Sequence, residues 1–150
     1  RGGQDRAAIP QARGAEASSP SQEVTDVRTT EGRVERTFVD KRREIEFANG
    51  LKKVMWPDGR TTVLFQNGDR KEIYSDGIVV YHYTATGAVQ TTLTDGTEIY
   101  QFSEGQFERH CPDGSKEIQF PNGTSKQIFA DGSEEIRFAD GTIRRTAAQR

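Results

Sequence analysis

Side chains that could perform catalysis or bind a metal are few in this sequence and poorly spaced for either task. The two histidines, His82 and His110, fall on different predicted strands about three repeats apart, so we do not expect them to share a metal. Cys111, the single cysteine, occupies a position that is otherwise mostly aromatic, and we expect it to act as a small apolar side chain. No two carboxylates stand out as an acid–base pair, and there is no phosphate-binding loop. We therefore expect a protein that is not an enzyme and uses no cofactor or metal.

Aromatic residues form the clearest pattern, and the chemistry that they offer is binding. They recur every nine residues in one slot, with a single ten-residue step. Aromatic and β-branched residues favour strands, so this slot predicts a series of short strands with rings along them. The slot is occupied by Phe38, Phe47, Trp56, Phe65, Tyr74, Tyr83, Leu93, Phe102, Cys111, Phe120, Phe129 and Phe138.

A second nine-residue pattern is a series of glycines, most of which follow Asn or Asp. Asn-Gly and Asp-Gly supply two consecutive residues that tolerate positive φ, which the two-residue type I′ hairpin turn requires. We therefore predict that each glycine closes a hairpin between antiparallel strands. The ten-residue step predicts a three-residue loop or bulge over Ala85–Gly87. The glycines are Gly50, Gly59, Gly68, Gly77, Gly87, Gly96, Gly105, Gly114, Gly123, Gly132 and Gly141.

A two-residue turn determines which residues face one another. It leaves about seven residues per strand and places the fourth residue of one strand opposite the fourth of the next. Side chains alternate between the two faces of a strand, so all even positions would share one face of the sheet. Phe65 and Tyr81 would then lie on the same face, two strands and roughly 10 Å apart. The opposite face would be mostly charged and polar.

Composition favours one exposed layer over a conventional core. Hydrophobic residues make up 32% and charged residues 29% of the 150 residues, which leaves too little apolar surface for two packed layers. We predict an all-β fold: a long single-layer antiparallel β-meander of about 12 strands, with both faces exposed to solvent. Cross-strand pairs would stabilise it strand by strand. Residues 32–150 would form this domain, and residues 1–31, which lack aromatics and periodicity, would form a disordered linker.

Several classes of function fit the sequence poorly. The formal charge is −2 and basic and acidic residues are interleaved, so we expect neither nucleic acid nor a membrane as partner. A calcium-binding β-roll would need more glycine and aspartate in each repeat. A secreted module that stacks sugars on its aromatic rows is an alternative. The single cysteine instead favours a reducing compartment and a cytosolic protein.

The turn motifs resemble the glycine-rich G-box repeats of the T-complex-protein C-terminal (TCP) domain, which ends CPAP-type centriole assembly scaffolds. The resemblance covers Gly32 to about Thr146 and includes the central segments VVYHY, TTLTDG and EGQFERHCPDG. It implies an open single-layer sheet that binds a proline-rich segment of a STIL-type centriole protein. It also implies a location in the cytoplasm and cytoskeleton, at the centriole or centrosome. The motifs are FANG (Phe47–Gly50), WPDG (Trp56–Gly59), CPDG (Cys111–Gly114), FPNG (Phe120–Gly123) and FADG (Phe129–Gly132 and Phe138–Gly141).

The resemblance matches three residues to peptide-binding positions of the family: Phe65, Tyr81 and Glu108. Polyproline is already extended and loses little entropy on docking against aromatic rings, which fits the first two. Glu108 could pair with a ligand arginine, although its odd position predicts the opposite face. The hydroxyls of Tyr81 and Tyr83 could bond ligand carbonyls. Further residues expected to flank the peptide are Val63, Tyr74, Thr91 and Leu93.

An alternative hypothesis is a self-associating structural repeat. An open sheet has two edge strands with unpaired backbone groups, and we expect these edges near Val34 and Ile143. Head-to-tail pairing of the edges would extend the sheet into filaments. The two hypotheses are compatible.

Overall fold

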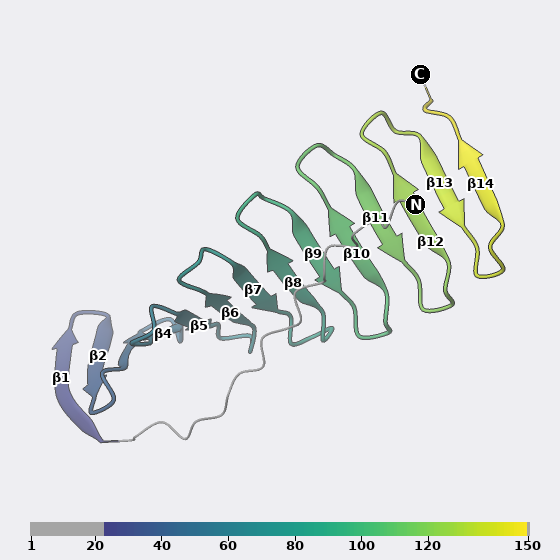
Figure 1. Cartoon of the computed structure of the whole chain (residues 1–150). Helices are drawn as coiled ribbons and strands as arrows, with labels where there is room; N and C mark the ends of the chain where they lie inside the picture. The colour runs from purple at the N-terminus through teal and green to yellow at the C-terminus, as the bar shows by residue number, and fades with distance from the viewer. Residues whose placement is uncertain (1–22, 150) are drawn as a thin grey trace.

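The computed structural model describes residues 23–149, which form one antiparallel sheet whose fourteen strands lie in chain order (Figure 1). The predicted all-β single-layer meander is therefore confirmed. Most strands are only four residues long and are joined by tight hairpin turns. The strands are β1 (Val24–Thr30), β2 (Arg33–Phe38), β3 (Arg43–Phe47), β4 (Lys52–Met55), β5 (Thr61–Leu64), β6 (Arg70–Ile73), β7 (Val79–His82), β8 (Val89–Thr92), β9 (Glu98–Gln101), β10 (Phe107–His110), β11 (Lys116–Gln119), β12 (Ser125–Ile128), β13 (Glu134–Arg137) and β14 (Ile143–Thr146).

The sheet begins earlier than the sequence pattern suggests. β1 pairs with β2, with Thr30 opposite Arg33, so the predicted linker is wrong for residues 24–30. β1 lacks the aromatic residue of the repeat, which is why the pattern did not reveal it. Residues 1–22 of the predicted linker lie outside the described residues. Val34 consequently lies inside the sheet, and the edge strands are β1 and β14, the latter containing Ile143 as predicted.

Apart from the Glu31–Gly32 turn between β1 and β2 and the longer loop after β7, the turns contain three residues and not two. In a representative turn, the Phe65 N–H donates to the Asp69 carbonyl (2.9 Å) and the Gly68 N–H donates to the Phe65 carbonyl (3.0 Å). Gly68 has a φ of 91°, whereas among the described non-glycine residues only Lys41 has a positive φ. This is a type I turn followed by a left-handed glycine, a common three-residue hairpin. The predicted type I′ turns are wrong.

The turn asparagines and aspartates act through their side chains. The side-chain oxygen accepts the N–H two residues further on, as between Asn67 and Asp69 (2.9 Å), and this bond holds the type I turn. The ten-residue step adds one residue to the standard loop. Because the Tyr83 N–H donates to the Ala88 carbonyl (2.9 Å), the loop covers residues 84–87 and is one residue longer than predicted.

The extra turn residue changes which side chains share a face. The third residue after each turn glycine faces the fourth residue after the next turn glycine, as Thr62 faces Glu72. Even positions therefore alternate between the two faces from strand to strand, because a register change of one residue moves every side chain to the other side. The prediction that all even positions share one face is wrong, and both faces carry apolar and charged residues.

We call one side of the sheet the packed face because its central row is buried. Ile99 is 2% exposed. Glu72 is 4% exposed and lies between Arg60 (3.7 Å) and Arg70 (3.4 Å). Side chains of neighbouring short strands thus bury one another without a second layer. The buried row runs Val54, Thr62, Glu72, Val80, Thr91 and Ile99.

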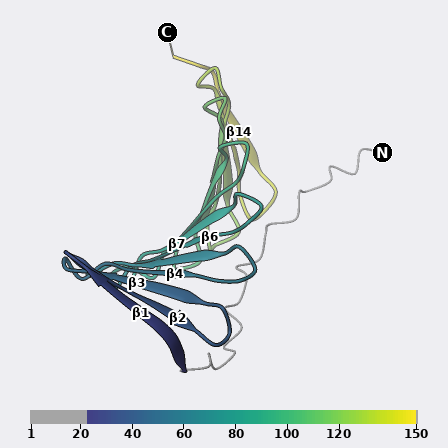
Figure 2. The same cartoon turned by 90° about the vertical axis from the view of Figure 1, so that its left-hand side faces the viewer.

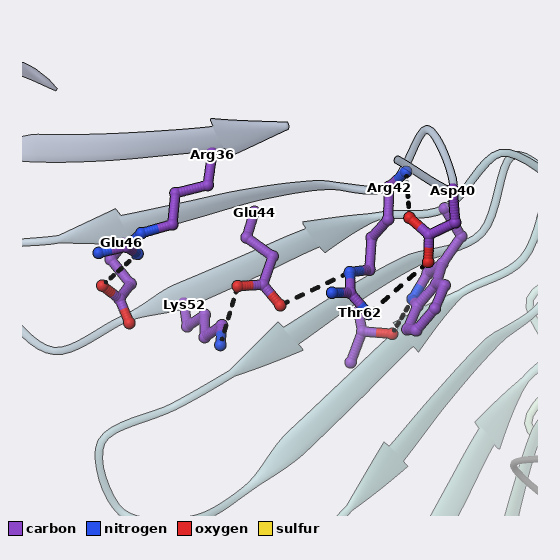
Figure 3. A network of polar contacts seen from close by, with 8 residues as sticks. Arg36, Asp40, Arg42, Glu44, Glu46, Lys52 and Thr62 are labelled. Atoms are coloured by element: carbon purple, nitrogen blue, oxygen red, sulfur yellow. Dashed lines mark hydrogen bonds and ion pairs between the residues drawn. The ribbon is translucent and has the colours of Figure 1, made fainter. Parts of the chain in front are cut away.

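Arginine and aromatic side chains alternate at the β2–β5 end of the packed face. The Arg42 guanidinium lies 4.0 Å from the Phe38 ring centroid and 5.6 Å from that of Trp56. Arg60 lies 4.7 Å from the Trp56 centroid. Figure 3 shows Arg42 with Thr62 beside it, whose hydroxyl accepts the Trp56 Nε1–H (3.0 Å). Cation–π contacts of this kind contribute about 0.5–1 kcal/mol each at exposed sites and more when desolvated, so they stabilise this end in place of an apolar core.

The sheet twists and curves along its length (Figure 2), and its turns alternate between two long edges (Figure 1). Strands two apart are separated by about 10 Å, so charges in successive turns of one edge are well spaced. One edge carries an aspartate in six successive turns: Asp40, Asp58, Asp76, Asp95, Asp113 and Asp131. The other edge carries asparagines in three of its turns: Asn49, Asn67 and Asn122.

Candidate binding surface

The side of the sheet opposite the packed face, which we call the ring face, carries a set of accessible aromatic residues. Its central row follows from the strand pairing, in which Tyr81 faces Lys71 on one side and Gln90 on the other. These side chains are half-buried, in contrast to the buried central row of the packed face. Across β5–β10 the row runs Val63, Lys71, Tyr81, Gln90, Tyr100 and Glu108.

Phe65, Tyr81 and Tyr83 form the first of two aromatic clusters on the ring face. The ring centroids of Phe65 and Tyr81 are 5.7 Å apart with the planes tilted by 36°. Those of Tyr81 and Tyr83 are 4.4 Å apart with a tilt of 44°. Phe65 and Tyr81 share a face as predicted, but their rings are closer than the predicted strand spacing because the Tyr81 hydroxyl reaches back to Asp69.

Asp69 lies between the strands of this first cluster and is only 8% exposed. Its Oδ2 accepts the Tyr81 hydroxyl (2.8 Å) and its Oδ1 accepts the Thr84 N–H (2.9 Å). The bond from the Thr84 backbone, followed by that from Tyr81, lowers the pKa of Asp69. The bond to Asp69 in turn raises the pKa of Tyr81. Near neutral pH the Asp69 carboxylate is therefore ionised and the Tyr81 phenol is protonated. These protonation states allow Tyr81 to donate its hydrogen bond to Asp69.

Tyr100, Phe102 and His110 form the second aromatic cluster. Tyr100 and Phe102 are stacked, with centroids 6.3 Å apart and planes 10° apart. The His110 ring lies 4.9 Å from Tyr100. The Tyr100 hydroxyl donates to Glu98 Oε2 (2.7 Å), and this bond, followed by burial, raises the pKa of Tyr100 to about 12. The second cluster is therefore fixed by a hydrogen bond from a tyrosine to a carboxylate, as the first is.

Glu108 lies beside the second cluster. Its carboxylate accepts the Gln106 Nε2–H (2.9 Å) and lies 3.0 Å from His110 Nε2. Glu108 faces Tyr100, so it lies on the ring face together with Tyr81, and the prediction that it lies on the opposite face is wrong. The error comes from the two-residue turn on which that prediction rested. The side chain is 18% exposed, so a positioned carboxylate remains accessible to a ligand cation.

Four other predicted site residues divide between the two faces. Val63 lies on the ring face, in the same row as Tyr81. Tyr74, Thr91 and Leu93 lie on the packed face, because even positions alternate between faces. The Tyr74 hydroxyl donates to Glu72 (2.9 Å), and Thr91 is 7% exposed. The structure therefore does not place these three residues beside the aromatic clusters.

The ring face also contains residues that sequence reasoning missed. Tyr100 and His110 belong to the second cluster. Gln90 lies between the two clusters, since it faces both Tyr81 and Tyr100, and its Oε1 accepts the Tyr83 hydroxyl (2.6 Å). Counting along the rows with a three-residue turn would have brought them together. The hydroxyl protons of Tyr81 and Tyr83 are already donated within the sheet, which leaves the ring surfaces and the hydroxyl oxygens for a ligand.

The ring face offers contact surfaces of several chemical kinds. Within residues 23–149, no group of three metal-ligating side chains comes together. The same part of the chain contains no helix long and apolar enough to cross a membrane. The ring face presents two aromatic clusters, the amide of Gln90 between them and the half-buried carboxylate of Glu108. Such a surface is suited to binding an extended peptide chain.

Comparison with known structures identifies the family. The chain is 30% identical to the TCP10c domain of Drosophila melanogaster Sas-4, with a TM-score of 0.59 over 77% of this chain and 98% of that domain. The chain belongs to the TCP10 domain family. The family model for the T-complex protein 10 C-terminus matches residues 94–128 of this TCP10 domain, which include β9–β12.

Two solved structures of TCP10 domains contain bound partners. The domain of Danio rerio CPAP, in complex with a peptide of Danio rerio STIL, is 40% identical with a TM-score of 0.71 over 75% of this chain and 63% of that one. The SAS-4 domain of Drosophila melanogaster, in complex with a proline-rich motif of Ana2, is 28% identical with a TM-score of 0.62 over 82% of this chain and 95% of that one. The centrosomal P4.1-associated protein of Mus musculus is 46% identical over 81 residues, which are 53% of this chain and 6% of that protein.

Proposed function

We propose that this TCP10 domain is a non-enzymatic scaffold module that binds a proline-rich segment of a STIL-type centriole protein on its ring face. Its relatives support the partner class, because the domain of Danio rerio CPAP binds a STIL peptide and that of Drosophila SAS-4 binds a proline-rich motif of Ana2. The observation that carries the proposal is the pair of accessible aromatic clusters on the ring face, with Glu108 beside the second, which together extend from Phe65 to Glu108.

The length of this row suits an extended peptide. Phe65 and Glu108 are separated by five strand intervals, or about 24 Å at a strand spacing of about 4.8 Å. A polyproline II helix rises about 3.1 Å per residue, so about eight residues would span the surface. Prolines would lie against the tilted rings of the first cluster, and a basic ligand residue would reach Glu108.

The cellular setting is part of the same proposal. The curated relatives are centrosomal proteins by name, which supports a location in the cytoplasm and cytoskeleton, at the centriole or centrosome. Acidic and basic residues are interleaved along the chain, which supports a protein partner over nucleic acid or a membrane surface.

Calorimetric titration with a proline-rich, arginine-containing peptide tests this function. We expect micromolar binding to the wild-type domain and loss of at least about tenfold in affinity on Phe65→Ala or Tyr81→Ala, because each substitution removes a ring from the first cluster. Phe120→Ala is the matched control, since Phe120 occupies the same slot beyond the second cluster. Equal losses at all three positions, or no loss at any of them, would contradict the proposed site.

Self-association is a second candidate, favoured by the two open edges of the sheet. All four residues of β14 are exposed, and β1 exposes Val24 (39%) and Val27 (54%). Pairing of β14 with β1 of a second copy would satisfy the unpaired backbone groups of both edges. Sedimentation over a wide concentration range tests this, with Ile143→Lys as the variant that should lower association. A protein that stays monomeric throughout would rule it out.

A further inference from the structure

The residue that follows the turn glycine has an unusual identity at one place in the sheet. At every other described turn this position is basic, apolar or uncharged, and only at Asp69 is it a carboxylate. Asp69 is also among the most buried polar residues of the protein, at 8% exposure, although it lies at an edge of the sheet next to a turn. A buried carboxylate in such a place requires specific partners.

The Asp69 carboxylate has three hydrogen-bond partners. Its own turn supplies the Asn67 Nδ2–H (3.2 Å). The Tyr81 hydroxyl (2.8 Å) reaches it from β7, and this bond joins two strands of the ring face. The third partner is the backbone N–H of Thr84 (2.9 Å), the first residue of the four-residue loop that follows β7. Thr84 Oγ1 also donates to the Gly68 carbonyl (2.6 Å), so the irregular loop is attached to the preceding turn on the same edge.

The position of Asp69 in the row explains why these bonds matter for the rings. Phe65 on the preceding strand donates its N–H to the Asp69 carbonyl. Arg70 pairs with His82 in antiparallel strands, so the preceding residue, Asp69, faces Tyr83. Asp69 thus lies between two rings of the first cluster, and the bond from the hydroxyl brings the third ring, that of Tyr81, over it.

We propose that Asp69 is a positioning residue for the peptide-binding surface: it anchors the hydroxyl of Tyr81 and the loop at Thr84, and so holds the Tyr81 ring against Phe65 and Tyr83. This inference rests on the proposed function for its effect on binding. Asp69 itself lies beneath the cluster and acts through Tyr81. The ten-residue repeat supplies the loop whose N–H completes the anchor.

The arrangement of rings in the free domain gives the first test. Nuclear Overhauser contacts between the Tyr81 ring and those of Phe65 and Tyr83 are expected in the wild type and in Asp131→Ala, whose aspartate bonds Ser133 within its own turn. They are expected to weaken or vanish in Asp69→Ala. In Tyr81→Phe, which removes only the hydroxyl, the corresponding contacts of the new ring should weaken as well. Contacts that persist at wild-type strength in both variants overturn the proposal.

Peptide affinity gives the second test. Asp69→Ala and Tyr81→Phe should each weaken binding of a proline-rich peptide by about three- to tenfold, and the double variant should be no weaker than the weaker single variant, because both remove the same anchor. Additive losses, or an unchanged affinity in Asp69→Ala while Phe65→Ala binds more weakly, would overturn the proposal. If the wild-type domain binds no such peptide, the proposed function fails, and the ring contacts still decide whether Asp69 positions Tyr81.

Discussion

Glu108 and Tyr81 lie in one row on the same face of the sheet, three strands apart, with Gln90 and Tyr100 between them as direct cross-strand neighbours. Three strand intervals correspond to about 14 Å, which an extended proline-rich chain covers in about four or five residues. A ligand whose prolines contact the Tyr81 ring can therefore present a basic side chain to Glu108 without changing direction.

Neutralising Glu108 should weaken binding of arginine-containing peptides specifically. Glu108→Gln keeps the size of the side chain but removes its charge, so we expect about a three- to tenfold loss of affinity for the arginine peptide. A peptide with alanine in place of that arginine should bind both proteins equally. Calorimetry with the two peptides forms a double-mutant cycle.

The matched control for that cycle is Glu117→Gln. Glu117 faces Arg109 on the packed face and lies one strand further along. Its substitution should leave both peptide affinities unchanged. A Glu108→Gln variant that weakens both peptides alike would show that Glu108 acts on the sheet and not on the ligand arginine.

Replacing Lys41 by glycine should stabilise the domain. Lys41 occupies the position of the turn glycine and has a φ of 71°, in the left-handed region that disfavours side chains with a Cβ. We expect Lys41→Gly to raise the free energy of unfolding by about 1 kcal/mol, measured by thermal or urea unfolding. Lys53→Gly, inside β4, should do the opposite, and a lower stability of Lys41→Gly would contradict the strain assigned to this turn.

The packed face should contribute more to stability than the ring face. Ile99 is 2% exposed in the central row of the packed face, so Ile99→Ala should lower the free energy of unfolding by about 2–4 kcal/mol. Ile118 lies half-buried in the central row of the ring face, and Ile118→Ala should lower it by about 1–2 kcal/mol. Urea unfolding compares the two, and equal losses would show that the faces do not differ as the burial indicates.

Acid should destabilise the sheet through its turn aspartates. Hydrogen bonds from the Ser133 hydroxyl and then from its N–H lower the pKa of Asp131. A lowered pKa in the folded state contributes stability that is fully present above the unfolded value, about 3.9, and is lost as pH falls through the folded value. The difference in melting temperature between wild type and Asp131→Asn should therefore shrink as pH is lowered from 6 towards about 2.

The converse substitution provides a control for the acid effect. Asn122 accepts the Thr124 N–H in an equivalent turn (2.9 Å), so Asn122→Asp should introduce a new acid-dependent contribution to the melting temperature. A difference between Asp131→Asn and wild type that stays constant over this pH range would argue against ionisation as the cause.

The repeat itself predicted the fold but not the register. Glycines and aromatic residues every nine positions were sufficient for an antiparallel meander in chain order, because each unit is local and contacts only its neighbours. The register depended on whether each turn contains two residues or three. Asn-Gly and Asp-Gly occur in both kinds of turn, so they did not distinguish between them. Pro57, Pro112 and Pro121 carried the missing signal. Proline fixes a negative φ, which suits the first turn residue of type I and excludes type I′.

The candidate site was predicted only in part for the same reason. Phe65 and Tyr81 share a face under either register. They lie two strands apart, so a change of face at each of the two turns between them restores the original face. Glu108, three strands beyond Tyr81, changes face when the turn length changes, and so do Tyr74 and Thr91. The anchoring of Tyr81 by Asp69 could not be predicted from the sequence. It depends on the direction in which the Tyr81 side chain extends from its own strand towards the neighbouring one.

The most direct measurement is a crystal structure of the domain with a bound proline-rich, arginine-containing peptide. We expect the peptide on the ring face, crossing the strands from Phe65 towards Glu108, with its prolines against Tyr81 and Tyr83. A peptide added as a further strand to β1 or β14, or one that lies on the packed face, would contradict the account.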